Sequence, residues 1–418
     1  MDNFDIALIV LGGLLVVGAL LSGVAKRSFL SLTALYVLAG FALGEGGLGV
    51  LQFSADSGFV KELAILALVV ILFRDGLEVE SELLATQWHL PLRKLVVAMP
   101  ITAAIITLAG HLIAGLSWLE AGLLGALLSP TDPVLSSAVV TNPRVPRLIR
   151  NSLNLESGLN DGLALALIIP IAAALNGTSD GQVWWQFMLE DMSIGFVAGI
   201  AIGYVASMLI PRPSDLDGAI PDHHKVLYAL GVAFLTYGLL SLAGHGNAFI
   251  AVYVCAITLG VRRGDIRDYF SSGAEEIVEL VKLGIFVVFG SILTVQALFE
   301  SGWAAVAIVV VTLTVARTAG VWLSLIGNRE RLSTQTKAFM SWFGPKGVAT
   351  MTYSLFLLAL GIPGATEVTN LAALCVVTSI IAHGLTDTPG ANWIGRRAAA
   401  AREKALATGT PVPPDAVV

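Results

Sequence analysis

The chain has 418 residues, of which 56% are hydrophobic and only 13% are charged, and its formal net charge is -6. Soluble domains carry about 25% charged residues, so this composition excludes a soluble enzyme, a nucleic-acid-binding protein and a disordered chain. The apolar segments are long and do not alternate, which indicates a membrane protein built from helices and not from a barrel.

Thirteen apolar segments are candidate membrane spans, because a helix needs about 20 residues to cross the hydrocarbon layer. The first segment lacks a basic start and a cleavage motif, so we expect a retained span and not a signal peptide. The predicted spans are residues 5–25, 29–45, 60–76, 95–116, 118–140, 153–175, 190–211, 225–243, 246–261, 275–297, 301–326, 337–361 and 366–386.

The basic residues support this count, because Lys and Arg accumulate in cytoplasmic loops. When the predicted loops are taken alternately, one set and the C-terminal tail hold nearly all of them, and the other set holds only Lys61. We therefore expect a multi-pass protein of the cell (inner) membrane, embedded in the lipid bilayer, with its N-terminus outside and its C-terminus in the cytoplasm. Residues 1–390 would form the transmembrane domain and residues 391–418 a short disordered cytoplasmic tail.

The fifth predicted span contains an interruption, because Pro130 and Pro133 bracket Thr131 and Asp132. Neither proline can donate to the carbonyl four residues earlier, and free carbonyls deep in a membrane are tolerated only inside protein or beside a water-filled cavity. A hydroxyl, a carboxylate and bare carbonyls together suit a hard cation. The pattern favours a broken helix at an ion site, and the alternative is a simple proline kink.

The sixth predicted span carries an acidic cluster. Glu156 and Asn160 share one helical face, and Ser157 and Asp161 share the adjacent face. A carboxylate at the depth of Asp161 can bind a proton or a cation, so the pattern predicts one site for two competing ligands. For Glu156 the alternative is a structural ion pair with Arg317.

Three basic residues lie within the later spans, Lys282, Arg317 and Lys346, and they match in number the buried acids of spans five and six. Each unpaired charge at the bilayer centre costs about 2.5–3.5 kcal/mol, so we expect mutual compensation, either as helix–helix ion pairs or along an ion pathway.

The twelfth predicted span is also interrupted, since Gly344, Pro345 and Gly347 surround Lys346. The two interruptions lie seven spans apart and therefore run in opposite directions. Interruptions at corresponding positions of two inverted halves are typical of the binding site of a secondary transporter. We therefore predict an all-α fold with two inverted six-helix repeats, a linker span and two broken helices that cross.

The chain resembles the monovalent cation/proton antiporters of the NhaP and sodium/hydrogen-exchanger type. The stretches that carry the resemblance are SPTDPV (129–134), PRVPRLIRNSLNLESGLNDGLAL (143–165), LFRDGLEV (72–79), AVYVCAITLG (251–260), FGPKGVAT (343–350) and IAHGLT (381–386). The resemblance implies an NhaA-like antiporter fold and an elevator-type homodimer.

The resemblance also implies roles for individual residues. Na⁺ would bind at Asp161, Ser157, Thr131 and Glu156, and Asp161 would also bind the proton. Asn160 would be the neutral neighbour that marks electroneutral exchange. Asp132 would cap a half-helix at the crossing, and Arg317 would hold Glu156 and Asn160.

Two lysines are not explained by the resemblance. Lys346 stands where Arg is frequent, and a buried Lys can lose its proton, so the stoichiometry stays open. Lys282 has no implied role, and we expect it to serve only in packing.

The function that we expect is secondary antiport of Na⁺ against H⁺ in pH homeostasis, electroneutral, without a cofactor, enzymatic activity or a nucleic-acid partner. The sequence leaves open whether Li⁺ or K⁺ replaces Na⁺. One alternative is a K⁺/H⁺ antiporter of the same fold. The others are a cation channel, which would need filter-like repeats, and an intramembrane hydrolase, which would need a nucleophile with a partnered base.

Overall fold

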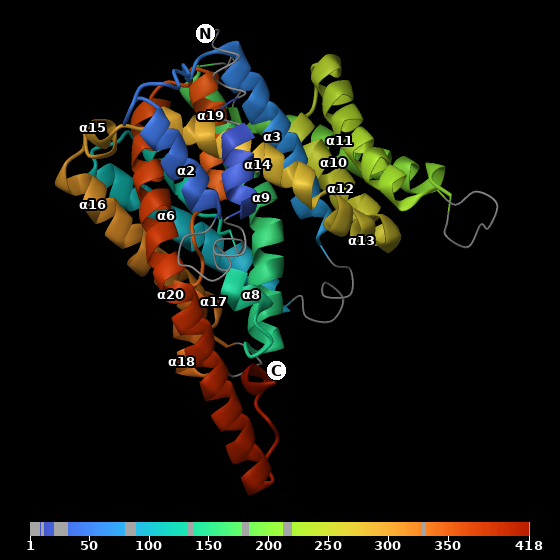
Figure 1. Cartoon of the computed structure of the whole chain (residues 1–418), viewed down its shortest axis with the longest axis vertical. Coiled ribbons are helices and arrows are strands. Elements are labelled where there is room, and N and C mark those ends of the chain that lie inside the picture. The colour runs from blue at the N-terminus through green and yellow to red at the C-terminus, as the bar shows by residue number, and fades with distance from the viewer. Residues whose placement is uncertain are drawn as a thin grey trace.

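The computed structural model describes residues 9, 12–20, 32–79, 89–132, 137–177, 184–211, 220–327 and 332–417. Within these ranges every regular element is a helix and there is no strand, which confirms the all-α prediction (Figure 1). Six of the described helices are long and apolar enough to cross a membrane, and four shorter helices of 10–17 residues are also apolar. The first predicted span lies mostly outside the described residues, so the count of thirteen spans stays a prediction.

The elements have the following bounds in chain order: α2 (Leu32–Leu43), α3 (Gly58–Leu77), α5 (His89–Arg93), a π-helical turn (Lys94–Ala98), α6 (Met99–Ile113), α7 (Trp118–Leu128), α8 (Ser137–Thr141), α9 (Arg147–Leu175), α10 (Trp184–Leu209), α11 (Asp222–Ala243), α12 (Ala248–Arg262), α13 (Gly264–Gly273), α14 (Glu275–Ser291), α15 (Val295–Leu298), α16 (Trp303–Val310), a second π-helical turn (Val311–Ala316), α17 (Arg317–Ser324), α18 (Thr334–Trp342), α19 (Val348–Ala359), α20 (Ala365–Thr408) and a 3-10 turn (Pro414–Ala416).

Polar residues at the helix ends fix where several helices begin. Ser117 and Glu120 form a capping box at the start of α7, in which Ser117 Oγ accepts from the Glu120 amide at 3.3 Å. The Glu120 carboxylate accepts in return from the Ser117 amide at 2.9 Å. Ser333 caps α18 in the same way through the amide of Thr336. Such caps satisfy amides that have no partner within the helix.

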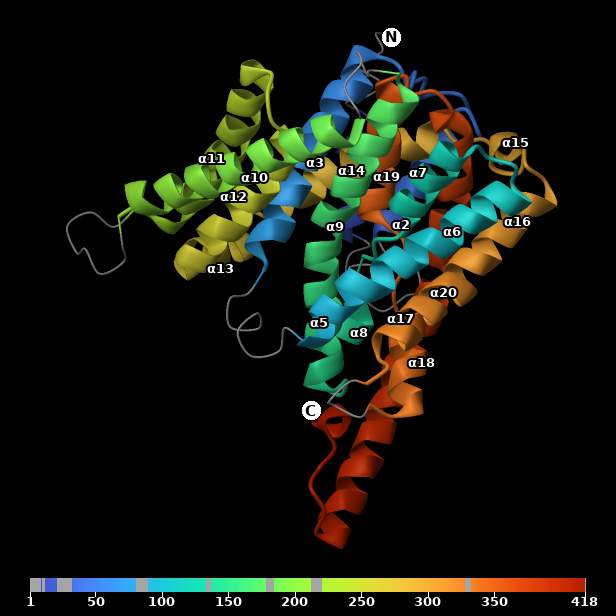
Figure 2. The same ribbon diagram turned by 180° about the vertical axis from the view of Figure 1, so that it is seen from behind.

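The helices form two groups that lie side by side. One group contains α2, α3 and α10–α14, and the other contains α6, α7, α9 and α16–α20 (Figures 1 and 2). Helix α19 contacts α7 and α20 in its own group and also α3 and α14 in the other group. The interior between the groups is therefore formed by α3, α9, α14 and α19.

Small residues allow the closest helix contacts in the first group. Gly40 of α2 lies against the backbone carbonyl of Val287 in α14, and Gly290 of α14 lies against the carbonyl of Val37. A Cβ atom at either glycine would overlap that carbonyl. Helices in membranes commonly pack through such small residues, because apolar burial provides little driving force between helices in lipid.

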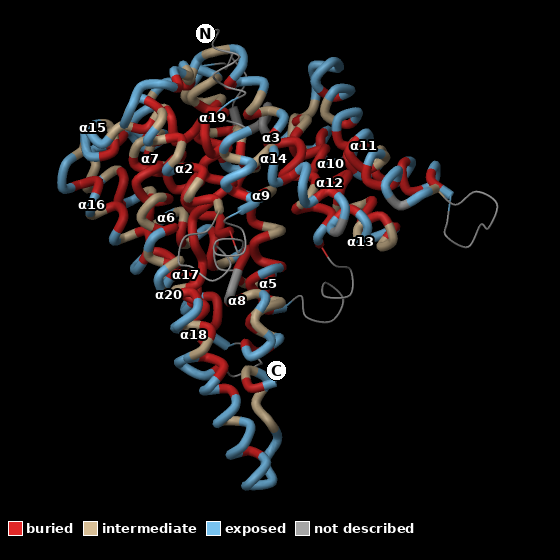
Figure 3. Tube along the Cα trace, in the orientation of Figure 1, coloured by how far each residue is buried: buried red, intermediate tan, exposed pale blue. Residues whose placement is uncertain are grey.

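Large apolar side chains are exposed on the outside of the helices, and buried residues concentrate where the two groups meet (Figure 3). Leu242 in α11 is 88% exposed and Leu112 in α6 is 74% exposed. Surfaces of this kind are unfavourable in water and are suited to lipid. Together with the six candidate spans, they identify the chain as a multi-pass membrane protein.

Both predicted interruptions are present. The fifth predicted span consists of α7, a non-helical segment at residues 129–132, and α8; Pro133 falls outside the described residues. The twelfth consists of α18, a non-helical segment at residues 343–347, and α19. The helices are interrupted at the predicted glycine and proline positions that the structure describes.

The C-terminal tail differs from the disorder that we predicted. Helix α20 continues without interruption to Thr408, where Gly409 ends it with a φ of 65°, and Figure 1 shows it extending beyond the other helices. Its alanine-rich part continues a helix that is already nucleated, which explains why low local hydropathy did not end it. Beyond α20 the chain turns back, and Asp415 Oδ2 accepts from the Ser333 amide at 3.0 Å and from Thr336 Oγ1 at 2.8 Å.

Candidate ion-binding site

The two interrupted helices cross, and Asp132 joins them. The Asp132 amide donates to the carbonyl of Pro345 at 2.9 Å, and its carboxylate accepts from the amide of Val348 at 3.1 Å. Thr350 adds a hydrogen bond of 2.8 Å from its hydroxyl to the Leu127 carbonyl. The Asp132 carboxylate thus caps the start of α19, where the helix dipole favours a negative charge, as predicted for this residue.

Lys346 has the complementary position at the end of α7. Its buried ammonium donates to the carbonyls of Pro130 at 3.1 Å and Ser129 at 3.4 Å. These carbonyls belong to the segment that the prolines remove from the helical pattern, so Lys346 supplies the donor that the broken helix lacks. A cation at a helix C-terminus is also favoured by the dipole.

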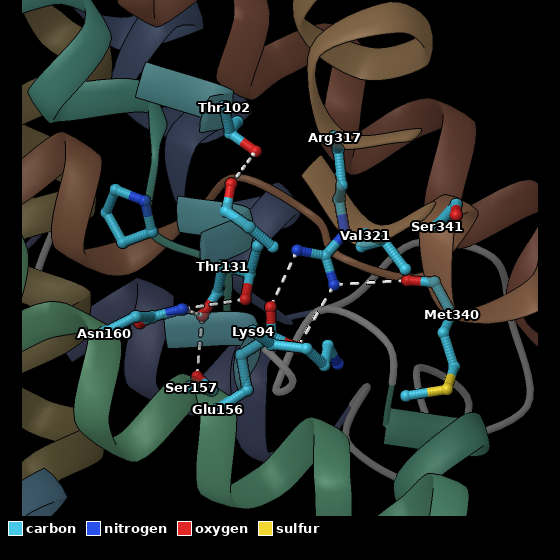
Figure 4. Close-up of polar contacts among 12 residues, drawn as sticks. Lys94, Thr102, Thr131, Glu156, Ser157, Asn160, Arg317, Val321, Met340 and Ser341 are labelled. Carbon is cyan, nitrogen blue, oxygen red and sulfur yellow. Dashed lines mark hydrogen bonds and ion pairs between the residues drawn. The ribbon is translucent and has the colours of Figure 1, made fainter. Parts of the chain in front are cut away.

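The interrupted segment is held against α9 through Thr131. Ser157 Oγ donates to the Thr131 carbonyl at 2.7 Å, and Asn160 Nδ2 donates to the Thr131 hydroxyl at 2.9 Å (Figure 4). The structure therefore brings together Thr131, Ser157 and Asn160, as the sequence predicted. Asn160 Oδ1 is buried and has no partner among the described residues.

Asp161 is the most distinctive group of the site. It is 7% exposed, and its carboxylate oxygen Oδ1 has no hydrogen-bond partner within the described part of the chain. Its backbone is fixed, because Tyr353 Oη donates to the Asp161 carbonyl at 2.9 Å. A buried carboxylate oxygen is costly unless a proton, a water molecule or a cation satisfies it.

Asp161 faces a cavity of about 30 Å³, which can hold one or two water molecules. Helix α3 contributes Asp75 to this cavity from the opposite group of helices, and Ser157 and Asp132 lie on the same side as Asp161. The complete lining is Ile71, Arg74, Asp75, Glu78, Asp132, Asn154, Ser157, Gly158, Asp161, Lys282 and Val348. Carboxylate and hydroxyl oxygens around so small a space suit a cation that has lost most of its water, or a proton.

Glu156 lies next to the cavity but points to a different set of partners. Arg317 Nη1 contacts Glu156 Oε1 at 2.9 Å, and the Lys94 ammonium forms a second ion pair with the same carboxylate (Figure 4). Arg317 also donates to the Met340 carbonyl at 3.2 Å. Glu156 is not among the residues that line the cavity. This geometry corresponds to the ion-pair alternative for Glu156 and not to direct contact with a cation.

Arg317 holds Glu156 as predicted, but its hydrogen bonds within the described residues do not include Asn160. The Asn160 amide is used by Thr131 instead.

Lys94 and Asp75 are site residues that the sequence analysis did not select. Lys94 was assigned to a cytoplasmic loop, because it lies at the edge of a predicted span, yet it is 0% exposed. The π-helical turn that begins at Lys94 has a counterpart that ends just before Arg317, so both bases that bind Glu156 adjoin such turns. π-Helical turns are rare in proteins as a whole, and those that occur are often found at functional sites. A single sequence does not show where such a turn will form.

Asp75 ends an apolar stretch beside Arg74, whose Nη1 atom lies 3.7 Å from the Asp75 carboxylate. The sequence feature that could have pointed to Asp75 is this pairing of an acid with an adjacent base near the end of a predicted span. Lys282 also lines the cavity, which the expectation of a packing role did not include.

A multi-pass helical protein in which two interrupted helices cross beside a buried carboxylate has the architecture of a secondary transporter. A family model described as "Sodium/hydrogen exchanger, transmembrane" matches residues 13–393, so the chain belongs to the sodium/hydrogen exchanger family. This result confirms the resemblance noted in the sequence.

Curated relatives are similar over most of this chain. The K(+)/H(+) antiporter NhaP2 of Shewanella sp. (strain MR-4) is 25% identical over 375 residues, which are 90% of this chain and 64% of that protein. The K(+)/H(+) antiporter NhaP of Alkalimonas amylolytica is 25% identical over 399 residues, which are 94% of this chain and 68% of that protein. This chain therefore spans about two thirds of the length of these relatives.

Solved structures show the same fold. The sodium proton antiporter MjNhaP1 from Methanocaldococcus jannaschii at pH 8 superimposes with a TM-score of 0.78 at 20% sequence identity, covering 94% of this chain and 99% of that chain. An electron-microscopy structure of MjNhaP1 gives a TM-score of 0.68 at 21% identity.

Proposed function

We propose that this protein is a secondary antiporter that exchanges a monovalent cation for a proton, and that Asp161 binds the two ligands alternately. The observation that carries the proposal is the buried Asp161 oxygen, which has no hydrogen-bond partner among the described residues and lies at a cavity beside the crossing of α7 and α19. Ser157 lines the same cavity, and its hydroxyl donates to the Thr131 carbonyl, so these two residues are the further oxygen ligands in our proposal.

Our first candidate for the transported cation is Na⁺, which Li⁺ could replace. Our second candidate is K⁺. The relatives named as K(+)/H(+) antiporters support K⁺, whereas MjNhaP1, which is described as a sodium proton antiporter, supports Na⁺. Both cations fit a site made of oxygen ligands, and they differ mainly in the oxygen spacing that each prefers.

Electroneutral exchange is supported by the way in which three other buried charges near the crossing are used. Asp132 and Lys346 are engaged at helix ends, and Glu156 is engaged by two bases. Since Asn160 is neutral, one proton is released for each monovalent cation bound at Asp161, and the net charge that moves per cycle is zero.

Alternating access requires that the cavity open to each side of the membrane in turn. In our proposal the group of helices with α7, α9 and α19 moves as a unit past α3 and α14, in an elevator-type homodimer in the cell (inner) membrane. The N-terminus would lie outside and the C-terminus in the cytoplasm, as the distribution of basic residues predicts.

The test is proton flux driven by a cation gradient in proteoliposomes, with Na⁺, K⁺ and Li⁺ used in turn. We expect wild-type flux with at least one of these cations and background flux for Asp161→Asn, because an amide cannot exchange a proton for a cation. Asp56→Asn, at an exposed acid outside the site, should keep wild-type flux. Normal flux through Asp161→Asn would overturn the assignment, and currents above carrier rates would favour a channel.

A further inference from the structure

Lys282 of α14 lies between two cavities. The smaller one contains Asp161, and the larger one, of about 200 Å³, lies where α3 ends and α14 begins. Three residues line both cavities, namely Arg74, Glu78 and Lys282. These residues therefore form the boundary that a cation must pass if it enters the ion cavity through the larger one.

The two bases at this boundary differ in how their charges are compensated. Arg74 Nε contacts Glu78 Oε1 at 2.9 Å, one helical turn away. Lys282 forms no ion pair within the described ranges. Lys282 lines the ion cavity together with the carboxylates of Asp75, Glu78 and Asp132, which attract its ammonium, and with the guanidinium of Arg74, which repels it.

The ammonium of Lys282 is thus attracted to the same carboxylates that would attract an incoming cation. A lysine carries its charge on a flexible four-carbon stem. The Lys282 ammonium can therefore lie at the boundary between the two cavities, which is the mouth of the ion cavity, or withdraw into the larger cavity. A further positive charge at the mouth is unfavourable unless a carboxylate compensates it, as Glu78 does for Arg74, because like charges a few ångströms apart repel strongly inside a protein.

We propose that Lys282 is a tethered cation that competes with the transported cation at the mouth of the ion cavity and thereby keeps the affinity for that cation low. This inference rests on the proposed antiport function. It gives Lys282 a role in setting affinity, and the role does not require that Lys282 bind either transported ion.

The first test measures the apparent KM for Na⁺ and for K⁺ of wild-type protein, Lys282→Gln and Lys282→Met in proteoliposomes. Both neutral variants should lower the KM by about tenfold, equivalent to about 1.4 kcal/mol, while the maximal flux stays within about twofold. Lys282→Arg keeps the charge and should keep the KM. Lys61→Gln, at an exposed lysine of α3, is the matched control and should also keep it.

A second test uses the wild-type chain and does not depend on the folding of a variant. Labelling of Lys282 by a water-soluble amine reagent, read by mass spectrometry, should increase in saturating Na⁺ or K⁺ compared with choline, because the cation displaces the ammonium from the mouth.

The outcomes separate this inference from the proposed function. An unchanged or increased KM in the neutral variants, loss of their flux while wild-type protein is active, or labelling that does not increase would each overturn the role of Lys282. Absence of cation-dependent flux in wild-type protein would instead overturn the antiport function.

Discussion

Three charged residues near the crossing each have a defined local use. Asp132 accepts from a backbone amide, Lys346 donates to backbone carbonyls and Glu156 is bound by two bases. Burying a charge is expensive unless such partners satisfy it. One oxygen of Asp161 differs from this pattern, because the part of the chain that the structure describes offers it no partner, and it is therefore our candidate for a ligand that binds and dissociates.

The ion pair between Arg317 and Glu156 should contribute strongly to stability. In Arg317→Met the Glu156 carboxylate keeps only Lys94, and the carbonyl of Met340 loses its donor. Removing one partner of a buried pair costs roughly 3–5 kcal/mol, so we expect a clear drop in the thermal unfolding temperature in detergent.

The matched control for that variant is Arg267→Met, which removes an exposed pair with Asp268 and should cost at most about 1 kcal/mol. Equal unfolding temperatures for the two variants would contradict a structural role for the buried pair.

Among the individual residues, those of the site in α9 and in the two interruptions could be predicted from the sequence, because acids and prolines within apolar spans are conspicuous. It could not predict that Lys94 joins them. Lys94 lies at the edge of a span, and only the π-helical turn and the packing of α9 show that its side chain points inward.

The helix ends at the crossing depend on hydrogen bonds as much as on charge. Asp132→Asn keeps an oxygen that can accept from the Val348 amide, whereas Asp132→Ala removes the cap. Loss of an N-cap costs about 0.5–2 kcal/mol. We therefore expect Asp132→Ala to unfold at a lower temperature than wild type, and Asp132→Asn to lie closer to wild type.

Thermal unfolding in detergent measures this order directly. If Asp132→Asn were as unstable as Asp132→Ala, the negative charge of Asp132 would matter more than its hydrogen bond, and the capping role would be rejected.

The two broken helices could be predicted because proline and glycine act locally, through lost donors and backbone freedom. The tail could not be predicted in the same way. Residues 391–408 are rich in alanine and carry several charges, so they read as a segment outside the membrane, but the preceding span supplies a helix that they continue.

For the whole molecule, competition between a proton and a cation at one carboxylate predicts the pH dependence of exchange. Protons displace the cation at low pH and become scarce at high pH, so the rate should pass through a maximum. We expect this profile in proteoliposomes with equal pH on both sides, and little change when a membrane voltage is imposed. A rate that rises or falls steadily with pH would argue against a shared site, and strong voltage dependence would argue against electroneutral exchange.

The arrangement of the two helix groups could be predicted from the sequence only in outline. Positive charges and helix interruptions predicted how the chain threads through the membrane. That α3 and α14 face α9 and α19 depends on contacts between helices far apart in the chain, such as that of Gly158 in α9 with the Asp75 carbonyl of α3, and these contacts have no pattern that a single sequence reveals.

The segment that follows α20 links the starts of α9 and α18. Asp415 binds the first turn of α18, and the carbonyl of Val417 accepts from the amide of Arg147, the first residue of α9, at 3.1 Å. The practical consequence concerns protein engineering. A purification tag or fluorescent reporter inserted into this segment would disturb contacts at the starts of α9 and α18, so its bulk would act on the helix that carries Asp161 and on the helix that precedes the interruption with Lys346.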